Sequence, residues 1–132
     1  MAFMRTVDGD VDVKEMGKVY AHDHIYCIPA LWKEKSQDDL LLDSAEASQA
    51  ELELFARAGG RTIYDATAID YGRDVRTVKR IANAAGVQII ATAGFNKSIM
   101  WPAVMPGTDV TFQAWIDGQS RAELCSHVVG EV

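Results

Sequence analysis

The sequence predicts an α/β fold built on a parallel sheet, and three features support that prediction. Segments with strand character at residues 18–25, 61–67 and 87–93 alternate with segments of helical periodicity. The last of these strands is nearly all apolar, as expected for a parallel strand covered on both faces. A short hairpin precedes them, so the chain reads as one domain or a piece of one.

Length and charge limit the possible classes of protein. The 132 residues are 48% hydrophobic, which is typical of a globular protein with one modest core. A closed eight-stranded α/β barrel needs roughly 250 residues, so a whole barrel does not fit. Nineteen acidic residues against thirteen basic ones give a net charge of −6, which argues against a nucleic-acid partner.

The sequence favours a cytoplasmic location. Residues 1–17 lack the apolar run of a signal peptide, and no apolar stretch is long enough to span a bilayer. Cys27 and Cys125 are far apart and form no Cys-x-x-Cys pattern, so both are expected to stay reduced.

Local signals justify the first elements in order. Asp8-Gly9-Asp10 predicts the turn of a hairpin over residues 3–13. The strand at residues 18–25 follows, and residues 31–42 are expected to be irregular. A helix is predicted to begin at Asp43 as its cap and to end at Gly59-Gly60.

The later elements follow the same logic. Asp74 is expected to cap a second helix that ends at Gly86. Residues 94–118 are predicted to be a long loop, and a loop of that length is more often functional than idle. Ser120 and Glu123 form a Ser-x-x-Glu capping box, which predicts a third helix continuing to the end of the sequence.

The His22-Asp23-His24 motif is the strongest chemical signal. Residues two apart on a strand point to the same side, so the two imidazoles share one face at the strand end. Such a pair can bind one divalent cation, with zinc the default and manganese, cobalt or iron also suitable. From the pair alone, two histidines without a ligand role remain an equal interpretation.

Four separated motifs carry a family resemblance. They are Met16-Gly17 with residues 21–25, residues 58–67, residues 72–74, and residues 86–95. In this order the pattern resembles the phosphotriesterase-like family of the amidohydrolase superfamily, and the match is collinear over the whole chain. The resemblance implies a (β/α)8 TIM-barrel fold, of which residues 1–132 supply the N-terminal hairpin and the first three βα units.

The resemblance also implies an activity. It indicates a hydrolase with two divalent metal ions, zinc by default, that activate a bridging hydroxide, with His22 and His24 binding one ion. The bridging ligand, later histidines and aspartate base of the family have no counterpart here, so the general base is expected beyond Val132. Glu131 is rejected as the bridging acid because it falls in the third helix. Cys27 is rejected as a metal ligand because alternation along the strand places it on the face opposite His22 and His24.

The expected substrate is a lactone, with a phosphorylated sugar lactone as the sharper hypothesis and slow phosphotriester hydrolysis as a side activity. No organic cofactor is expected, and pairing of two copies is common in the family. The alternatives are a non-catalytic truncated fragment, a half-barrel that needs association, and a small doubly wound ligand-binding domain. The absence of a glycine-rich phosphate loop counts against the last of these.

Further residues have two interpretations each. Lys97 follows the third strand and would contact an anionic substrate group, or is a solvated loop lysine. Phe95 and Trp101 would wall a substrate pocket, or pack under the loop. Asp65 would accept a hydrogen bond from a metal-bound histidine, or cap a local turn. His127 is expected to be a helix-face residue with no ligand role.

Overall fold

The chain divides into two units in the computed structural model, which describes residues 2–29, 41–98, 101, 103–105 and 107–131. The first, called the sheet unit, comprises residues 1–27, 42–67 and 74–92. The second, called the loop–helix unit, comprises residues 28–41, 68–73 and 93–132. Each is described by itself.

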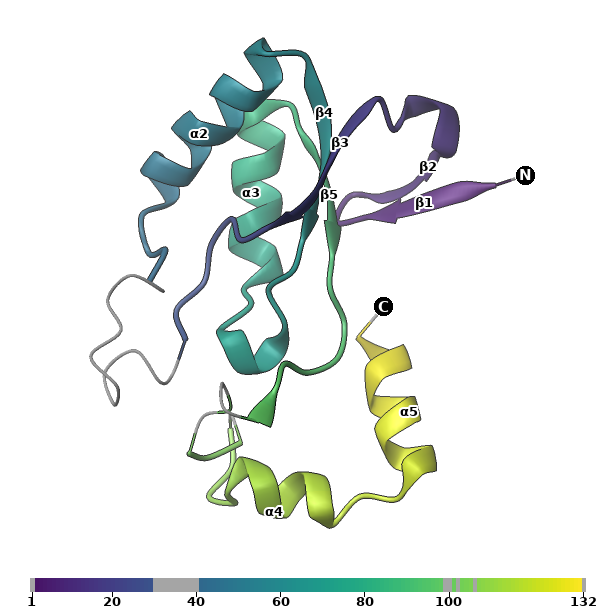
Figure 1. The fold of residues 1–132 in the computed structure, drawn as a ribbon, viewed down its shortest axis with the longest axis vertical. Coiled ribbons are helices and arrows are strands. Elements are labelled where there is room, and N and C mark those ends of the chain that lie inside the picture. The colour runs from purple at the N-terminus through teal and green to yellow at the C-terminus, as the bar shows by residue number, and fades with distance from the viewer. Residues whose placement is uncertain (1, 30–40, 99–100, 102, 106, 132) are drawn as a thin grey trace. The chain divides into compact units, whose positions relative to one another are not determined.

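The strands of the sheet unit form two sheets (Figure 1). β1 (Phe3–Thr6) and β2 (Gly9–Asp12) pair as an antiparallel hairpin. β3 (Lys18–Asp23), β4 (Gly60–Asp65) and β5 (Gln88–Ala91) form a parallel sheet in the order β3-β4-β5. The carboxyl ends of these three strands therefore meet at one edge.

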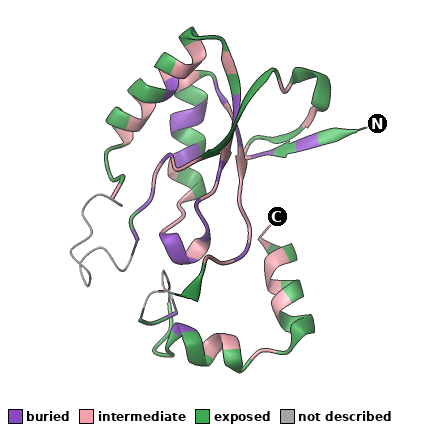
Figure 2. Ribbon diagram, in the orientation of Figure 1, coloured by how far each residue is buried: buried purple, intermediate pink, exposed green. Residues whose placement is uncertain are grey.

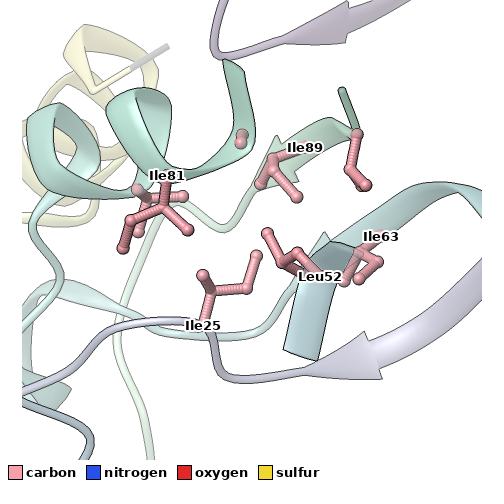
Figure 3. Close-up of a cluster of buried hydrophobic side chains, with 8 residues drawn as sticks. Ile25, Leu52, Ile63, Ile81 and Ile89 are labelled. Atoms are coloured by element: carbon pink, nitrogen blue, oxygen red, sulfur yellow. The ribbon is translucent and has the colours of Figure 1, made fainter. Parts of the chain in front are cut away.

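Two helices connect the parallel strands and lie on the same side of the sheet in Figure 1. They are α2 (Ala45–Arg57) and α3 (Val75–Ala85). Eight buried side chains from the sheet, both helices and the adjoining loops make one hydrophobic cluster (Figure 3). Its members are Ile25, Leu52, Ile63, Val78, Ile81, Ala82, Val87 and Ile89. Burying a side chain of this size stabilises a fold by about 1.5–3 kcal/mol.

Burial differs sharply among the strands (Figure 2). β4, in the middle of the sheet, has Thr62, Ile63 and Asp65 buried, whereas every residue of β3 except Asp23 is exposed. In β5 only Ile89 is fully buried, so the prediction of a doubly covered third strand was wrong for the described residues.

The loop–helix unit contains only short elements. Among its described residues, these are the 3₁₀ helix η3 (Ile69–Tyr71) and the α-helices α4 (Phe112–Asp117) and α5 (Arg121–Gly130). A further 3₁₀ turn, η1 (Val13–Glu15), lies in the sheet unit after the hairpin. None of the helices in the described part of the chain has the length and apolar composition needed to cross a membrane.

Several element boundaries correct the sequence predictions. The hairpin turn is Val7-Asp8, one place earlier than expected, because Thr6 pairs with Gly9. The first parallel strand ends at Asp23, so His24 lies just beyond it. The predicted irregular stretch at residues 31–42 lies outside the described residues except for its last two.

The helix ends are also revised. Ser44 rather than Asp43 caps α2, because the Ser44 side chain accepts a hydrogen bond from the Ala47 amide. α4 interrupts the loop predicted over residues 94–118. The predicted capping box at Ser120 is confirmed, but α5 stops at Gly130, with Glu131 as its C-cap, instead of continuing.

Candidate metal-binding site

His22 and His24 lie together where β3 ends. The Asp23 carbonyl accepts a hydrogen bond from Ala66 N at 2.8 Å, which ties this end of β3 to the chain leaving β4. The centroids of the two imidazole rings are 5.5 Å apart, and the rings are nearly perpendicular at 83°. His22 is exposed and His24 is partly buried. Two adjacent imidazoles therefore stand at the carboxyl edge of the sheet.

Thr67, which follows β4, contacts the second histidine. Its Oγ1 lies 3.0 Å from His24 Nδ1 and donates or accepts according to the histidine tautomer. The same Oγ1 lies 2.5 Å from Asp65 Oδ1, and that carboxylate oxygen also accepts from the Thr67 amide at 3.0 Å. Asp65 therefore forms a local turn with Thr67 and reaches His24 through the threonine hydroxyl.

Burial sets the protonation behaviour of this group. It lowers the pKa of His24, and the nearby His22 acts in the same direction, whereas Asp65 and Asp23 oppose it. Burial also raises the pKa of Asp65, against the hydrogen bonds from Thr67, which lower it. A lowered histidine pKa favours the neutral imidazole, which is the form that binds a metal.

The separation of the two ring centroids matches that of two imidazoles on one cation. With zinc–nitrogen bonds of about 2.1 Å and tetrahedral angles, two bound imidazoles have centroids roughly 5 Å apart. The observed 5.5 Å is close to that value. Among the described residues, however, no three His, Cys, Asp or Glu side chains group to hold a metal ion. The described chain thus offers a pair of ligands and not a complete set.

A small cavity opens beside His24 within the sheet unit. Its volume is about 290 Å³, and its polar lining includes Asp23, Ser48 and Glu51. Ser48 Oγ donates to the Ile25 carbonyl at 2.6 Å, which ties α2 to the segment that follows the histidines. Cys27 is buried nearby in the chain, and burial raises the pKa of its thiol to about 11. The thiol therefore stays protonated at neutral pH.

The residues predicted to contact substrate lie in the loop–helix unit. Asp70, fully buried in η3, accepts a hydrogen bond from the Asn96 amide on both carboxylate oxygens at 3.0 Å. The Asn96 carbonyl in turn accepts from Trp101 Nε1 at 2.9 Å. These bonds fix the loop around Lys97, whose side chain is exposed.

Phe95 and Trp101 form part of an aromatic cluster. Phe95 stacks on His127 at 5.5 Å and meets Phe112 edge to face, and Trp101 packs against Phe112 at 5.0 Å. Phe95 and Trp101 also line an apolar cavity of about 500 Å³ together with α5. The ring contacts agree with packing under the loop, and the cavity agrees with a pocket wall.

Glu131 links distant segments of the loop–helix unit. Its Oε2 accepts from Arg73 Nη1 at 3.1 Å and from the Gly94 amide at 3.0 Å. Its Oε1 lies 3.1 Å from His127 Nε2, without the geometry of a hydrogen bond. Glu131 is therefore engaged in holding the unit together, and His127 is a packed residue rather than a plain helix-face one.

Sequence reasoning missed Thr67, Asp70 and Arg73, and it weighed Glu131 only as a bridging acid. The Asp65-x-Thr67 spacing after a strand is a recognisable turn signal, and it could have pointed to Thr67. Asp70, Arg73 and Glu131 carry no such signal, because their partners lie 26 to 58 residues away in the sequence.

Comparison with known proteins identifies the family. A sequence profile described as "Phosphotriesterase family" matches residues 2–117. The chain belongs to this family. The predicted resemblance is thereby confirmed for most of the sequence.

Several proteins with enzyme names are similar to this chain. It is 28% identical to an N-acetyltaurine hydrolase of Rattus norvegicus over 98% of this chain and 47% of that protein. It is 34% identical to a phospho-furanose lactonase of Mycoplasmopsis synoviae over 82% of this chain and 33% of that protein. The solved lactonase Lmo2620 from Listeria monocytogenes matches with a TM-score of 0.93 and 45% identity, over 99% of this chain and 42% of that one.

The structural match also settles the fold class. The neighbours are phosphotriesterase-like α/β barrels, so the parallel sheet with its helices is part of a barrel of the (β/α)8 type, as predicted. The chain spans about a third to a half of the length of these relatives. The relatives are hydrolases by name, which supports hydrolysis as the reaction class of the family.

Proposed function

We propose that this protein is a metal-dependent hydrolase of the lactonase kind, in which His22 and His24 bind one divalent cation. The observation that carries the proposal is the pair of imidazoles at the end of β3, with ring centroids 5.5 Å apart. Active sites of α/β barrels lie at this carboxyl edge of the strands. The family and the hydrolase names of the relatives agree with it.

Two divalent ions are proposed for the complete centre, with zinc first and manganese, cobalt or iron as alternatives. When bound, they supply Lewis-acid activation of water and of the substrate oxygen. The chain's own histidines would hold one ion, and Asp65 would act on His24 through Thr67. The other ligands and the general base must come from groups outside the described residues.

A lactone is proposed as substrate rather than an amide. The lactonase relatives are 45% and 34% identical, whereas the N-acetyltaurine hydrolase is 28% identical. A phosphorylated sugar lactone is the sharper proposal, because Lys97 is an exposed cation on the loop after β5. Phe95 and Trp101 would contribute the apolar wall. We also propose slow phosphotriester hydrolysis as a side activity. Two copies of the protein are proposed to pair, and its location is proposed to be the cytoplasm.

Metal content provides the first test. The purified protein, dialysed against trace zinc, is analysed by mass spectrometry for bound metal, beside His22→Asn and His24→Asn. His127→Gln is the matched control, because the chain has only three histidines and this one packs among aromatic rings. We expect metal in the parent and control and its loss in both site variants. Equal metal in all four would refute the site.

Hydrolysis provides the second test. Release of acid is followed for a phosphorylated furanose lactone, a neutral lactone and N-acetyltaurine. Lys97→Met should raise KM for the phosphorylated lactone by about tenfold, as expected for an ionic hydrogen bond of roughly 1.5 kcal/mol, and change KM for the neutral lactone little. An equal rise for both lactones excludes the phosphate role. Metal binding without hydrolysis of any substrate would favour the non-catalytic alternative.

A further inference from the structure

The Thr67 hydroxyl lies between a carboxylate and an imidazole. Its Oγ1 is 2.5 Å from Asp65 Oδ1 and 3.0 Å from His24 Nδ1. Both Asp65 and Thr67 are fully buried, with exposures of 1% and 0%. A threonine hydroxyl has one proton to donate and lone pairs with which to accept. The Thr67 hydroxyl can therefore donate to only one of these two neighbours and must accept from the other.

The carboxylate decides that direction. Asp65 Oδ1 accepts from the Thr67 hydroxyl at 2.5 Å and from the Thr67 amide at 3.0 Å. The single proton of the hydroxyl is therefore used in the bond to Asp65. The hydroxyl has only a lone pair left to offer His24. Nδ1 of His24 must then carry the proton in this contact.

We propose that Thr67 is a positioning residue that holds His24 in the Nδ1–H tautomer, in which Nε2 carries no proton. That nitrogen is the one a divalent cation would use, because the hydrogen bond made by one ring nitrogen sets which form the other takes. The role of the cation rests on the proposed function above. The tautomer itself does not, because it is a property of the metal-free protein.

The backbone around Thr67 is fixed enough to impose this choice. The Asp65 carbonyl accepts from the Thr92 amide at 3.1 Å and from Thr92 Oγ1 at 2.7 Å. The Ala66 amide donates to the Asp23 carbonyl at 2.8 Å, which joins the Thr67 turn to the end of β3 beside His24. Supporting hydrogen bonds of this kind hold side chains in one productive orientation.

The test is nitrogen-15 NMR of the histidine rings in the metal-free protein, at a pH where histidine side chains are neutral. Signals are assigned with His22→Asn and His127→Gln. We expect His24 to show a protonated Nδ1 and a bare Nε2. Thr67→Val, which removes the hydroxyl but keeps the shape, should shift His24 towards the Nε2–H form, and Thr67→Ser should restore the Nδ1–H form.

Thr62→Val is the matched control. Thr62 is also fully buried on β4, and its hydroxyl bonds to the Met16 carbonyl and to Gln88 at the opposite end of the strand. Zinc affinity, measured by competition with a chelating dye, should fall about 10–100-fold in Thr67→Val and stay near the parent value in Thr62→Val and Thr67→Ser.

The outcomes separate this inference from the proposed function. A proton on Nε2 of His24 in the parent protein overturns the inference, and so does an equal loss of zinc affinity in Thr67→Val and Thr62→Val. If His24 shows the Nδ1–H form and loses it in Thr67→Val, the inference stands even where zinc does not bind. In that case only the proposed metal site is refuted.

Discussion

The sheet unit and the loop–helix unit bury different kinds of side chain. In the sheet unit, eight apolar residues from strands, helices and loops form one cluster. In the loop–helix unit, rings pack around Phe95 and Phe112, and the buried carboxylate of Glu131 joins Arg73 to the Gly94 amide. Apolar burial is non-directional and tolerant of small shifts, whereas a buried ion pair depends on both partners being present.

This contrast has a functional side. The proposed metal ligands stand on the sheet unit, where the strand ends are fixed by ladder hydrogen bonds. The proposed substrate residues stand on a loop held by the Asp70 and Trp101 hydrogen bonds. Metal sites need rigid placement, whereas substrate specificity is commonly varied through loops. Three predictions test whether the two units really differ in this way.

The largest effect is expected from Arg73→Met in the loop–helix unit. The Arg73 and Glu131 side chains are only 11% and 9% exposed, so removing the cation leaves a buried carboxylate without its main partner. Such a loss costs about 3–5 kcal/mol. Amide hydrogen exchange should accelerate in α5 by roughly two to four orders of magnitude and much less in α3.

Lys79→Met is the matched control for that variant. Lys79 pairs with Asp8 at 3.1 Å, but the two side chains are 47% and 40% exposed. An exposed pair contributes about 0–1 kcal/mol, so exchange should change little. Equal acceleration of α3 and α5 in Arg73→Met would mean that the two units unfold as one.

A comparable but somewhat smaller effect is expected from Ile89→Ala in the sheet unit. Ile89 is a fully buried member of the hydrophobic cluster. Truncating it should cost about 2–5 kcal/mol, through lost burial and the cavity left behind. Urea unfolding followed by circular dichroism measures the loss, and exchange should accelerate in α3 and β4. Val129→Ala, at 72% exposure, should stay within about 0.5 kcal/mol of the parent.

The sheet unit could be predicted because its core follows local periodicity. In α3, the buried residues Val78, Ile81 and Ala82 recur at helical spacing, and Asp74 and Gly86 mark its ends as expected. The pairing of His22 with His24 could be predicted for the same reason, since side chains two apart on a strand end lie side by side. The Thr67 contact to His24 spans 43 residues and could not.

The loop–helix unit could not be predicted because its contacts are long-range and polar. Glu131 meets Arg73 across 58 residues, and nothing in the local pattern of either residue indicates the other. α4 has six residues and lies within the segment predicted to be a loop. A helix this short is too brief to show a recognisable hydrophobic periodicity in the sequence. His127 was expected to be a plain helix-face residue, and its stacking on Phe95 depends on a loop packed from elsewhere.

The smallest effect concerns the cap of α2, where sequence and structure disagree by one residue. Ser44 has an extended backbone and its hydroxyl accepts from the Ala47 amide at 3.2 Å, whereas Asp43 lies one place outside. Ser44→Ala should therefore destabilise the sheet unit by about 1 kcal/mol, and Asp43→Ala by less than about 0.5 kcal/mol. Urea midpoints of the two variants decide between them. The reverse order would contradict this assignment and identify Asp43 as the cap of α2.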